Sequence, residues 1–250
     1  MAAPRVFAHR GASAAHPENT LAAYQRALAD GADGLECDVR LTRDGHLVCV
    51  HDRKVDRTSD GRGRVSAKTL AELRALDFGS WHGAGAPARV VALAELLDVA
   101  GDAGRPVELL VETKHPSRYG AAVERALRDL LVRHGLDGGA DRPVRVTAMS
   151  FAPMAVRRVR QWLPAIPTVQ LLDLLPPGMR TGRLPFAAPI AGPSVALLRS
   201  RPGLAGALRA AGKRIYLWTV NTDDEIELAR THAVDGVITD RPDRVRDRLG

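Results

Sequence analysis

The chain has 250 residues, of which 45% are hydrophobic and 26% are charged, and its formal net charge is +7. This length is typical of one large domain, and no apolar run approaches twenty residues, so we expect a single domain over residues 1–250 without a membrane anchor. Only 4% of the residues are aromatic and no basic run is interleaved with them, which argues against nucleic-acid binding. A strand predicted from residue 5 leaves no room for a secretory leader, so we expect a cytoplasmic protein.

Short β-like runs alternate with helical stretches along the whole chain. We predict strands near residues 5–9, 34–41, 106–113, 144–150, 167–172, 189–197, 214–220 and 236–240. Helices are predicted at 20–30, 93–100, 119–133, 154–163, 203–211 and 223–232, with a short one from 243. This alternation predicts a parallel sheet, and about eight such units predict a closed (β/α)8 TIM barrel. Two segments interrupt the pattern: a polar, Gly-rich insertion at about 53–92 with a short helix near 69–76, and a Pro-rich loop at 176–189.

Acidic residues alternate along the second predicted strand and recur on the third. Glu36 and Asp38 are two positions apart, so their side chains point to the same face of the sheet. Two carboxylates on one face repel each other unless a cation lies between them, and oxygen ligands suit a hard ion such as Ca2+ or Mg2+. On the third strand, Glu112 is placed to supply a third ligand, and Lys114, on the same face, a contact to phosphate. We therefore predict one divalent metal ion held by Glu36, Asp38 and Glu112.

Two histidines and an arginine lie where apolar runs end: His9, Arg10 and His51. A phosphodiester carries a negative charge that repels nucleophiles, and the predicted metal, Arg10 and Lys114 are suited to neutralise it. Cleavage also needs one group that removes a proton and another that supplies one to the leaving alkoxide, and histidine titrates near neutral pH. The residues thus predict a site that cleaves a small anionic phosphate ester, with His9 and His51 as the acid-base pair.

Several short motifs occur along the chain in a fixed order: HRG, PENT, GLECDVRLTRDG, VHD, VETKH, MSF, LWTVN and GVITDRP. Their order and spacing resemble those of the glycerophosphodiester phosphodiesterase family, in the phospholipase C-like phosphodiesterase superfamily, from about residue 5 to the C-terminus. The resemblance implies a TIM barrel with an insertion after the second strand, a divalent metal, and hydrolysis of glycerophosphodiesters to sn-glycerol 3-phosphate and an alcohol. It also implies that the glycerol 2-hydroxyl is the nucleophile and that water then opens a cyclic phosphate. The segment Val90-Val91-Ala92-Leu93 departs from the Pro-Thr-Leu pattern that is usual in the family.

The motifs also contain residues expected to support the site. We expect Trp218 to form an apolar wall beside the glycerol or the leaving alcohol. Glu18 and Asn19 are expected to hold the loop after the first strand and the surroundings of the metal. Supporting roles are also expected for three polar residues on or after predicted strands: Ser150, Gln170 and Asn221. Because no His–Asp pair is placed to activate the Ser150 hydroxyl, we do not expect it to be a nucleophile.

Two other functions fit the same residues. The first keeps the site and changes the substrate, as a lysophospholipase D-type or phospholipase C-like enzyme that cleaves a lipid phosphodiester. A lipid substrate requires an apolar groove, and the insertion offers few large apolar side chains, which favours a water-soluble diester. The second is a barrel that only binds anions, which the full set of carboxylates and imidazoles disfavours. The sequence is compatible with Ca2+ or Mg2+, with either histidine acting first, and with any oligomeric state.

Overall fold

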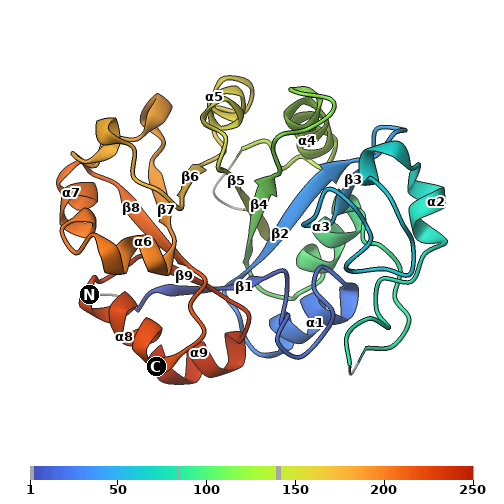
Figure 1. The fold of residues 1–250 in the computed structure, drawn as a ribbon, viewed down its shortest axis with the longest axis horizontal. Helices are drawn as coiled ribbons and strands as arrows, with labels where there is room; N and C mark the ends of the chain where they lie inside the picture. Colours follow the sequence, from blue (N-terminus) through green and yellow to red (C-terminus); the bar gives the residue numbers. More distant parts are fainter. Residues whose placement is uncertain (1–2, 84, 139–141, 250) are drawn as a thin grey trace.

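The computed structural model describes residues 3–83, 85–138 and 142–249, so residue 84 of the predicted insertion and the ends of the expected domain lie outside the described residues. Eight strands run parallel to their neighbours, and β1 pairs with both β2 and β9, which closes the sheet into a barrel (Figure 1). This confirms the predicted TIM barrel. The barrel strands are β1 (Arg5–His9), β2 (Gly34–Leu41), β4 (Val107–Thr113), β5 (Val144–Ser150), β6 (Thr168–Leu172), β7 (Ile190–Pro193), β8 (Arg214–Trp218) and β9 (Gly236–Thr239).

A ninth strand, β3 (Leu47–Cys49), pairs antiparallel with the carboxyl-terminal part of β2. It is not one of the eight predicted strands. The turn between them is closed by a hydrogen bond from the Thr42 amide to the His46 carbonyl (2.9 Å). Gly45 lies in this turn with φ +87°, a left-handed conformation that glycine adopts without a steric penalty. Because β3 runs back along β2, the Val50 amide reaches the Asp38 carbonyl (2.9 Å), and the next residue enters the barrel mouth.

Helices surround the strands in the order expected for this fold (Figure 1). They are α1 (Leu21–Ala29), α3 (Leu93–Gly101), α4 (Ala122–Arg133), α5 (Pro153–Trp162), α6 (Val195–Ser200), α7 (Leu204–Ala210), α8 (Asp223–Thr231) and α9 (Pro242–Leu249). In α4, buried residues recur with the helical period, so one apolar stripe faces the sheet. Thr222 caps α8 by accepting a hydrogen bond from the Glu225 amide, as its sequence predicts.

One predicted strand is too long. Residues 194–197 were expected to continue the strand from 189, but β7 ends at Pro193 and α6 begins at Val195. The Ser194 hydroxyl accepts a hydrogen bond from the Leu197 amide (3.1 Å) and so caps this helix. A short apolar run is equally compatible with a buried strand and a buried helix, and here the cap decides between them.

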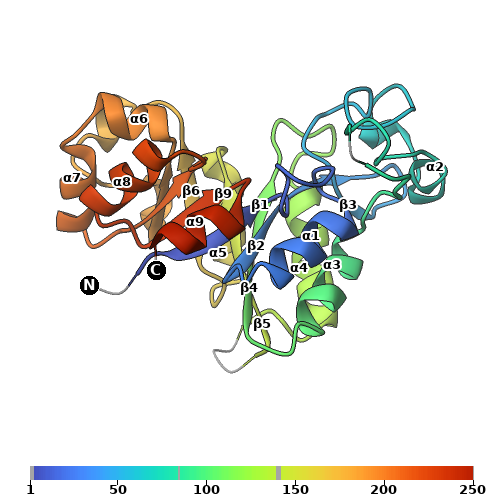
Figure 2. The same ribbon diagram turned by 90° about the horizontal axis from the view of Figure 1, so that it is seen from below.

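The insertion after β3 has a small apolar core of its own. It contains the 3-10 turn η1 (Val65–Ala67) and the short helix α2 (Leu70–Arg74), and both views place it beside β3 (Figures 1 and 2). Its core includes Val55, Val65, Leu73 and Phe78, packed against Val48 of β3. The predicted irregular loop at 176–189 contains two further 3-10 turns, η2 (Pro177–Met179) and η3 (Pro185–Ala187). The insertion is thus packed against the barrel next to the strand that leads to His51.

Inside the barrel, apolar side chains form a floor beneath the polar residues of β2 and β4. This floor consists of Phe7, Leu110, Met149, Val169, Leu171, Ile190, Tyr216 and Ile238. Two larger apolar clusters fill the space between the strands and the helices. Across the described ranges, no helix combines the length and apolar character needed to cross a membrane.

Candidate active site

Residues from seven barrel strands or their ends, together with His51 from the segment after β3, meet in one cavity of about 200 Å3 at the carboxyl ends of the barrel strands. Both predicted acid-base histidines, two of the predicted metal ligands and all three predicted substrate contacts line it. Its lining consists of His9, Arg10, Glu36, His51, Glu112, Lys114, Met149, Phe151, Leu171, Trp218 and Ile238. The carboxyl ends of the strands are also where TIM-barrel enzymes place their reactive groups.

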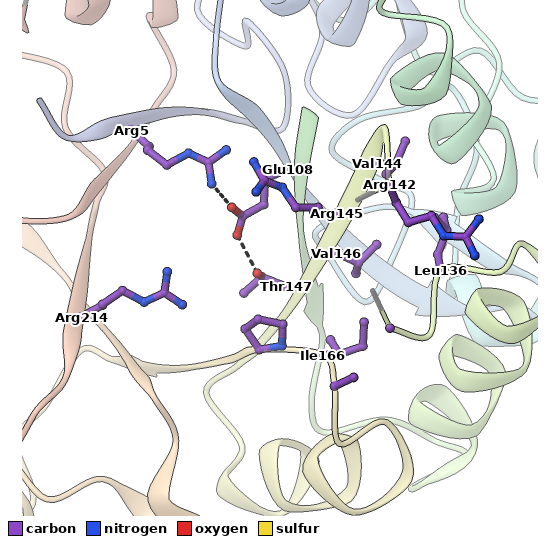
Figure 3. A pocket seen from close by; sticks show the side chains of 13 residues that line it. Arg5, Glu108, Leu136, Arg142, Val144, Arg145, Val146, Thr147, Ile166 and Arg214 are labelled. Atoms are coloured by element: carbon purple, nitrogen blue, oxygen red, sulfur yellow. Dashed lines mark hydrogen bonds and ion pairs between the residues drawn. The ribbon is translucent and has the colours of Figure 1, made fainter. Parts of the chain in front are cut away.

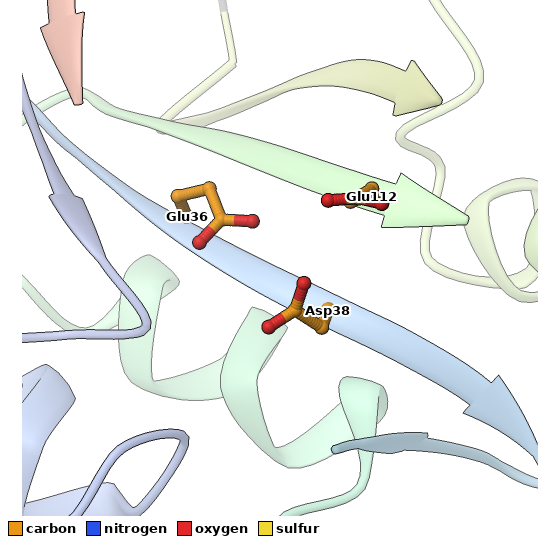
Figure 4. Close-up of side chains that lie close together, drawn as sticks. All are labelled: Glu36, Asp38 and Glu112. Atoms are coloured by element: carbon orange, nitrogen blue, oxygen red, sulfur yellow. The ribbon is translucent and has the colours of Figure 1, made fainter. Parts of the chain in front are cut away.

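The third predicted metal ligand, Asp38, completes a cluster of buried carboxylates (Figure 4). Glu36 and Asp38 point from β2 towards Glu112, which lies opposite Asp38 in the register of β2 and β4. One oxygen from each carboxylate lies within 4.8 Å of the others. Burial, followed by repulsion from Asp38, raises the pKa of Glu112 to about 7 and that of Glu36 well above its usual range. Without a cation, the three carboxylates therefore resist being charged together.

Two cationic side chains offset part of this charge. Arg10 Nε lies 3.0 Å from Asp38 Oδ2, while Lys114 Nζ lies 3.2 Å from Asp38 Oδ1 and 2.9 Å from Glu112 Oε1. Burial opposes ionisation of Asp38, but Arg10 and Lys114 outweigh it and hold the pKa of Asp38 below its ordinary value. Asp38 Oδ1 is buried and accepts no hydrogen bond of good geometry from any residue in the described part of the chain.

The donor set fits a hard divalent cation. Three ionised carboxylates against two cations leave one negative charge without a partner, and uncompensated buried charge is costly. Carboxylate oxygens at this separation are the ligands that Ca2+ and Mg2+ prefer. The residues present therefore match the predicted metal site, with Glu36, Asp38 and Glu112 as the groups that would hold the ion.

His9 is held by a carboxylate that the sequence reasoning missed. Its Nδ1 lies 2.6 Å from Asp240 Oδ1, and the same oxygen accepts a hydrogen bond from the Ser13 hydroxyl (2.9 Å). The other oxygen of Asp240 accepts a hydrogen bond from the Asn221 side-chain amide (2.7 Å). Asn221, which was expected to support the site, therefore contacts it through Asp240. Burial raises the pKa of Asp240, but His9, Asn221 and Ser13 outweigh burial and lower it to about 2. Asp240 directly follows β9, so the strand-end rule already pointed to it.

His51 is also held by a carboxylate, that of Asp52, which the sequence analysis did not predict as its partner. Its Nδ1 lies 2.7 Å from Asp52 Oδ1, and its backbone carbonyl accepts two hydrogen bonds from Arg40 (2.9 and 2.6 Å). Arg57, from the insertion, binds Asp52 through Nε (2.8 Å) and is the main reason that the pKa of Asp52 falls to about 2. Burial lowers the pKa of His51, so the neutral imidazole is favoured. Each histidine thus uses Nδ1 to hold a carboxylate and leaves Nε2 for other contacts.

The loop after β1 carries Arg10 in a left-handed conformation (φ 59°), and its amide donates to Glu36 Oε2 (3.1 Å). A side chain at Gly11 would come within 2.6 Å of the Ala23 backbone, so only glycine fits there. Glu18 accepts hydrogen bonds from Arg10 (3.0 Å) and from Arg57 (2.7 and 2.8 Å). The loop is therefore fixed on the carboxylate cluster through Glu18 and its two arginine partners.

Asn19 is also left-handed (φ 59°) and is buried beside the cluster. Its amide nitrogen lies 3.4 Å from Asp38 Oδ2, and its oxygen accepts from the Tyr24 hydroxyl (2.7 Å). Trp218 lines the cavity, donates from Nε1 to the Gly192 carbonyl (2.7 Å) and meets Phe151 edge to face at 5.4 Å. The indole and phenyl rings therefore form an apolar part of the cavity wall.

Ser150 and Gln170 point away from the cavity, because their neighbours Met149 and Leu171 point into it. The Ser150 hydroxyl donates to the Thr113 carbonyl (2.9 Å), and the Gln170 amide donates to the Phe151 carbonyl (3.1 Å). Both residues therefore tie strand ends together and do not line the site. Asn221 and Glu18 border an adjoining open hollow of about 520 Å3, which His9 and Arg10 also line.

A separate pocket of about 310 Å3 lies at the opposite, amino-terminal end of the barrel (Figure 3). Its walls carry Arg5, Arg145 and Arg214 around Glu108, which pairs with Arg5 and accepts from the Thr147 hydroxyl (2.6 Å). None of the predicted site residues lines this pocket. The paired imidazoles and the carboxylate cluster therefore belong to one end of the barrel only.

Sequence comparison with known proteins finds a family and relatives that match most of the chain. The model of the glycerophosphoryl diester phosphodiesterase family matches residues 9–244. A probable glycerophosphodiester phosphodiesterase 1 of Mycobacterium tuberculosis is 46% identical, over 97% of this chain and 91% of its own length. A glycerophosphodiester phosphodiesterase of Bacillus subtilis is 33% identical, over 94% of this chain and 83% of its own.

A solved structure gives the same fold. An Oleispira antarctica phosphodiesterase in complex with the product sn-glycerol-3-phosphate superposes with a TM-score of 0.84 at 25% identity, covering 99% of this chain and 97% of that one. Together with the family match over nearly the whole chain, these similarities show that the chain belongs to the glycerophosphoryl diester phosphodiesterase family.

Proposed function

We propose that this chain, folded as a single barrel domain, hydrolyses glycerophosphodiesters to sn-glycerol 3-phosphate and an alcohol. The observation that carries the proposal is the meeting of two carboxylate-bound imidazoles and a metal-type carboxylate cluster around one cavity of about 200 Å3. The family match, the names of the relatives and the product bound to the Oleispira antarctica neighbour support the same activity.

In the proposed reaction, His9 and His51 share the proton transfers. The Nε2 of one imidazole takes the proton of the glycerol 2-hydroxyl, whose oxygen bonds to phosphorus as the bond from phosphorus to the leaving alcohol breaks. The other imidazole gives its proton to the leaving alkoxide, so charge and protons balance. Water then opens the cyclic phosphate with the two imidazoles in exchanged roles, which yields sn-glycerol 3-phosphate.

The remaining residues prepare the diester for attack. A divalent cation held by Glu36, Asp38 and Glu112, when bound, neutralises charge on the non-bridging oxygens. Lys114 and Arg10 add positive charge from the cavity wall, and Asp240 and Asp52 fix the two imidazoles. The apolar wall around Trp218 excludes water from one side of the cavity and contacts the carbon atoms of the glycerol.

The size of the cavity favours a small water-soluble diester. The cavity of about 200 Å3 lies below the range of about 300–1,000 Å3 typical of drug-sized ligands and has room for the phosphodiester and glycerol. The adjoining hollow of about 520 Å3 is lined almost wholly by polar and charged residues, which does not suit an acyl chain. We therefore propose glycerophosphocholine-type substrates ahead of lysophospholipids.

The test measures release of sn-glycerol 3-phosphate from glycerophosphocholine, with lysophosphatidylcholine assayed in parallel. Chelation should abolish turnover, and Ca2+ or Mg2+ should restore it. His9→Ala and His51→Ala should each lower kcat by about 100-fold or more, whereas His134→Ala, at an exposed helix end, should not change it. Full activity after chelation, or in both histidine variants, would refute the proposed chemistry, and faster cleavage of the lysolipid would replace the proposed substrate.

A further inference from the structure

A second, narrow recess lies between β2, the insertion and the loop that follows β4, and we call it the basic recess. Its walls carry the side chains of Arg40, Arg53, Arg64, Lys114 and Arg118. No aspartate or glutamate is among its lining residues in the described part of the chain. The basic recess is therefore a concave surface formed by cationic groups from three different segments.

The arginines of the recess differ from the arginines of the catalytic site. Arg10 and Arg57 are each held by two carboxylates. In contrast, Arg53, Arg64 and Arg118 form no ion pair with any residue that the structure describes, and Arg40 donates only to the His51 carbonyl. Lys114 is the exception, since it pairs with Asp38 and Glu112. The four arginines repel one another, so an anion bound between them is favoured.

The walls of the recess are fixed without a ligand. The Tyr119 hydroxyl donates to the Ser66 carbonyl (2.6 Å), which ties the loop after β4 to the insertion. Within the insertion, the Val65 amide donates to the Arg53 carbonyl (3.1 Å), and Lys54 and Arg64 form an isolated β-bridge. Because the backbone on both sides is held, binding of a ligand needs to order only the arginine side chains and not the segments that carry them, which lowers the entropic cost of binding.

The recess adjoins the catalytic cavity. Lys114 lines both of them, and Arg40 holds the backbone of His51, one of the two imidazole residues. The two hollows are therefore neighbours on either side of Lys114, close enough for two ends of one substrate to be assigned to them. The recess has a volume of about 30 Å3, roughly that of two water molecules, which suits the terminal oxygens of one phosphoryl group and not a sugar ring.

We propose that the basic recess binds a second phosphoryl group carried by the alcohol part of the substrate. This proposal rests on the proposed function and adds a substrate class to it: glycerophosphodiesters whose leaving alcohol is itself phosphorylated. Guanidinium groups bind phosphoryl oxygens through paired, charge-assisted hydrogen bonds, so the four arginines of the recess suit such a group. A cationic choline head group gains nothing from this surface.

The test compares bis(glycerophospho)glycerol, which carries a second phosphate, with glycerophosphoglycerol, which lacks it, and with glycerophosphocholine. We expect the wild-type enzyme to show a kcat/KM at least about 10-fold higher for bis(glycerophospho)glycerol, the effect of one charge-assisted contact of about 1.4 kcal/mol. This preference should decrease as salt is added, because salt screens exposed charges.

The variants are Arg64→Gln, Arg118→Gln and their combination, with Arg62→Gln as the matched control. Arg62 is an exposed arginine of the same insertion that does not line the recess. Each recess variant should lower kcat/KM for bis(glycerophospho)glycerol about 5- to 10-fold through KM, with kcat and the turnover of glycerophosphocholine unchanged. The control should behave as the wild type, and unchanged turnover of glycerophosphocholine also shows that the variants are folded.

The outcomes separate the two proposals. Equal kcat/KM for the two glycerol diesters, or an equal loss on all substrates in the variants, would refute the recess while leaving the proposed function intact. A wild-type enzyme that cleaves none of the diesters would refute the proposed function. In that case calorimetric titration with bis(glycerophospho)glycerol decides on the recess: weaker binding by the double variant supports it, and equal binding refutes it.

Discussion

Replacement of Asp240 by Asn tests how the structure uses His9. Asn221 cannot turn its amide, because its oxygen already accepts from the Thr239 hydroxyl (3.1 Å) and the Asp240 amide (2.9 Å). The side-chain nitrogen of Asn221 must therefore face an oxygen of residue 240. An asparagine at position 240 has one oxygen, which Asn221 would take, so its NH2 group would face His9. His9 would then accept at Nδ1 and carry its proton on Nε2, the opposite of the arrangement in the wild type.

The structure sets the scale of the effect. The pKa of Asp240 falls from 3.8 to about 2 despite the opposing effect of burial, and the contacts with His9 are the largest favourable cause. A fall of this size corresponds to about 2.5 kcal/mol. If that interaction supports the charged imidazole during catalysis, its loss lowers kcat by up to about 70-fold, and the reversed tautomer lowers it further. We expect a fall of about 100-fold in kcat with KM within about 3-fold of the wild type.

The assay is steady-state hydrolysis of glycerophosphocholine, with the melting temperature measured on the same samples. Ser13→Ala removes a bond to the same carboxylate without touching the imidazole, and should lower kcat less than about 10-fold. Asp98→Asn, at an exposed position on α3, should have no effect. If Asp240→Asn retained more than about a third of the wild-type kcat in a folded protein, the pairing of His9 with Asp240 would have no catalytic role.

Three further predictions concern stability. Glu124→Ala removes a fully buried carboxylate that holds His115 (2.5 Å) and Arg158 (3.2 Å), and should lower the free energy of unfolding in urea by about 3 kcal/mol; a loss below about 1 kcal/mol would contradict this. Ala92→Ser supplies the side-chain cap that α3 lacks, where only the Glu95 carboxylate meets the Ala92 amide (2.8 Å), and should raise the melting temperature by about 2 °C; a lower value would show that the hydroxyl does not fit. Asp52 and Asp240 have folded pKa values of about 2, below their unfolded values near 3.9, so their contribution is complete above about pH 4 and is lost as the pH falls towards 2. A melting temperature that falls less steeply over this range in Asp52→Asn would confirm the sign, and an unchanged slope would contradict it.

The barrel was predictable because its signals are local. Strands buried on both faces and helices with a 3.6-residue stripe alternate along the chain outside the insertion and the loop at 176–189, and parallel pairing follows from that alternation. The antiparallel strand β3 was not among the eight predicted strands, because its three residues are too few to show a period of two. Ser194 is a typical residue for the start of a helix, but the apolar run after it is compatible with either a strand or a helix.

For the site, the period of two along a strand was the strongest guide. It placed Glu36 and Asp38 on one face, where the structure also has them, and the same rule applied to Met149 would have turned Ser150 outward. The partners of the imidazoles depend on contacts that local patterns do not encode: Asp240 is 231 positions from His9 in the chain. Asp52 is adjacent to His51, but adjacent residues need not interact, and only the turn after β3 brings their side chains together.

Arg57 of the insertion forms ion pairs with two separate parts of the site. Its guanidinium binds Asp52, which holds one imidazole, and Glu18, which holds the loop that follows the other. A displacement of the insertion would therefore change the ion pairs of both segments that carry the imidazoles. A foreign insertion grafted onto this barrel would therefore keep these contacts only when it restores a guanidinium at this position, so Arg57 is the residue that any exchange of the insertion has to retain.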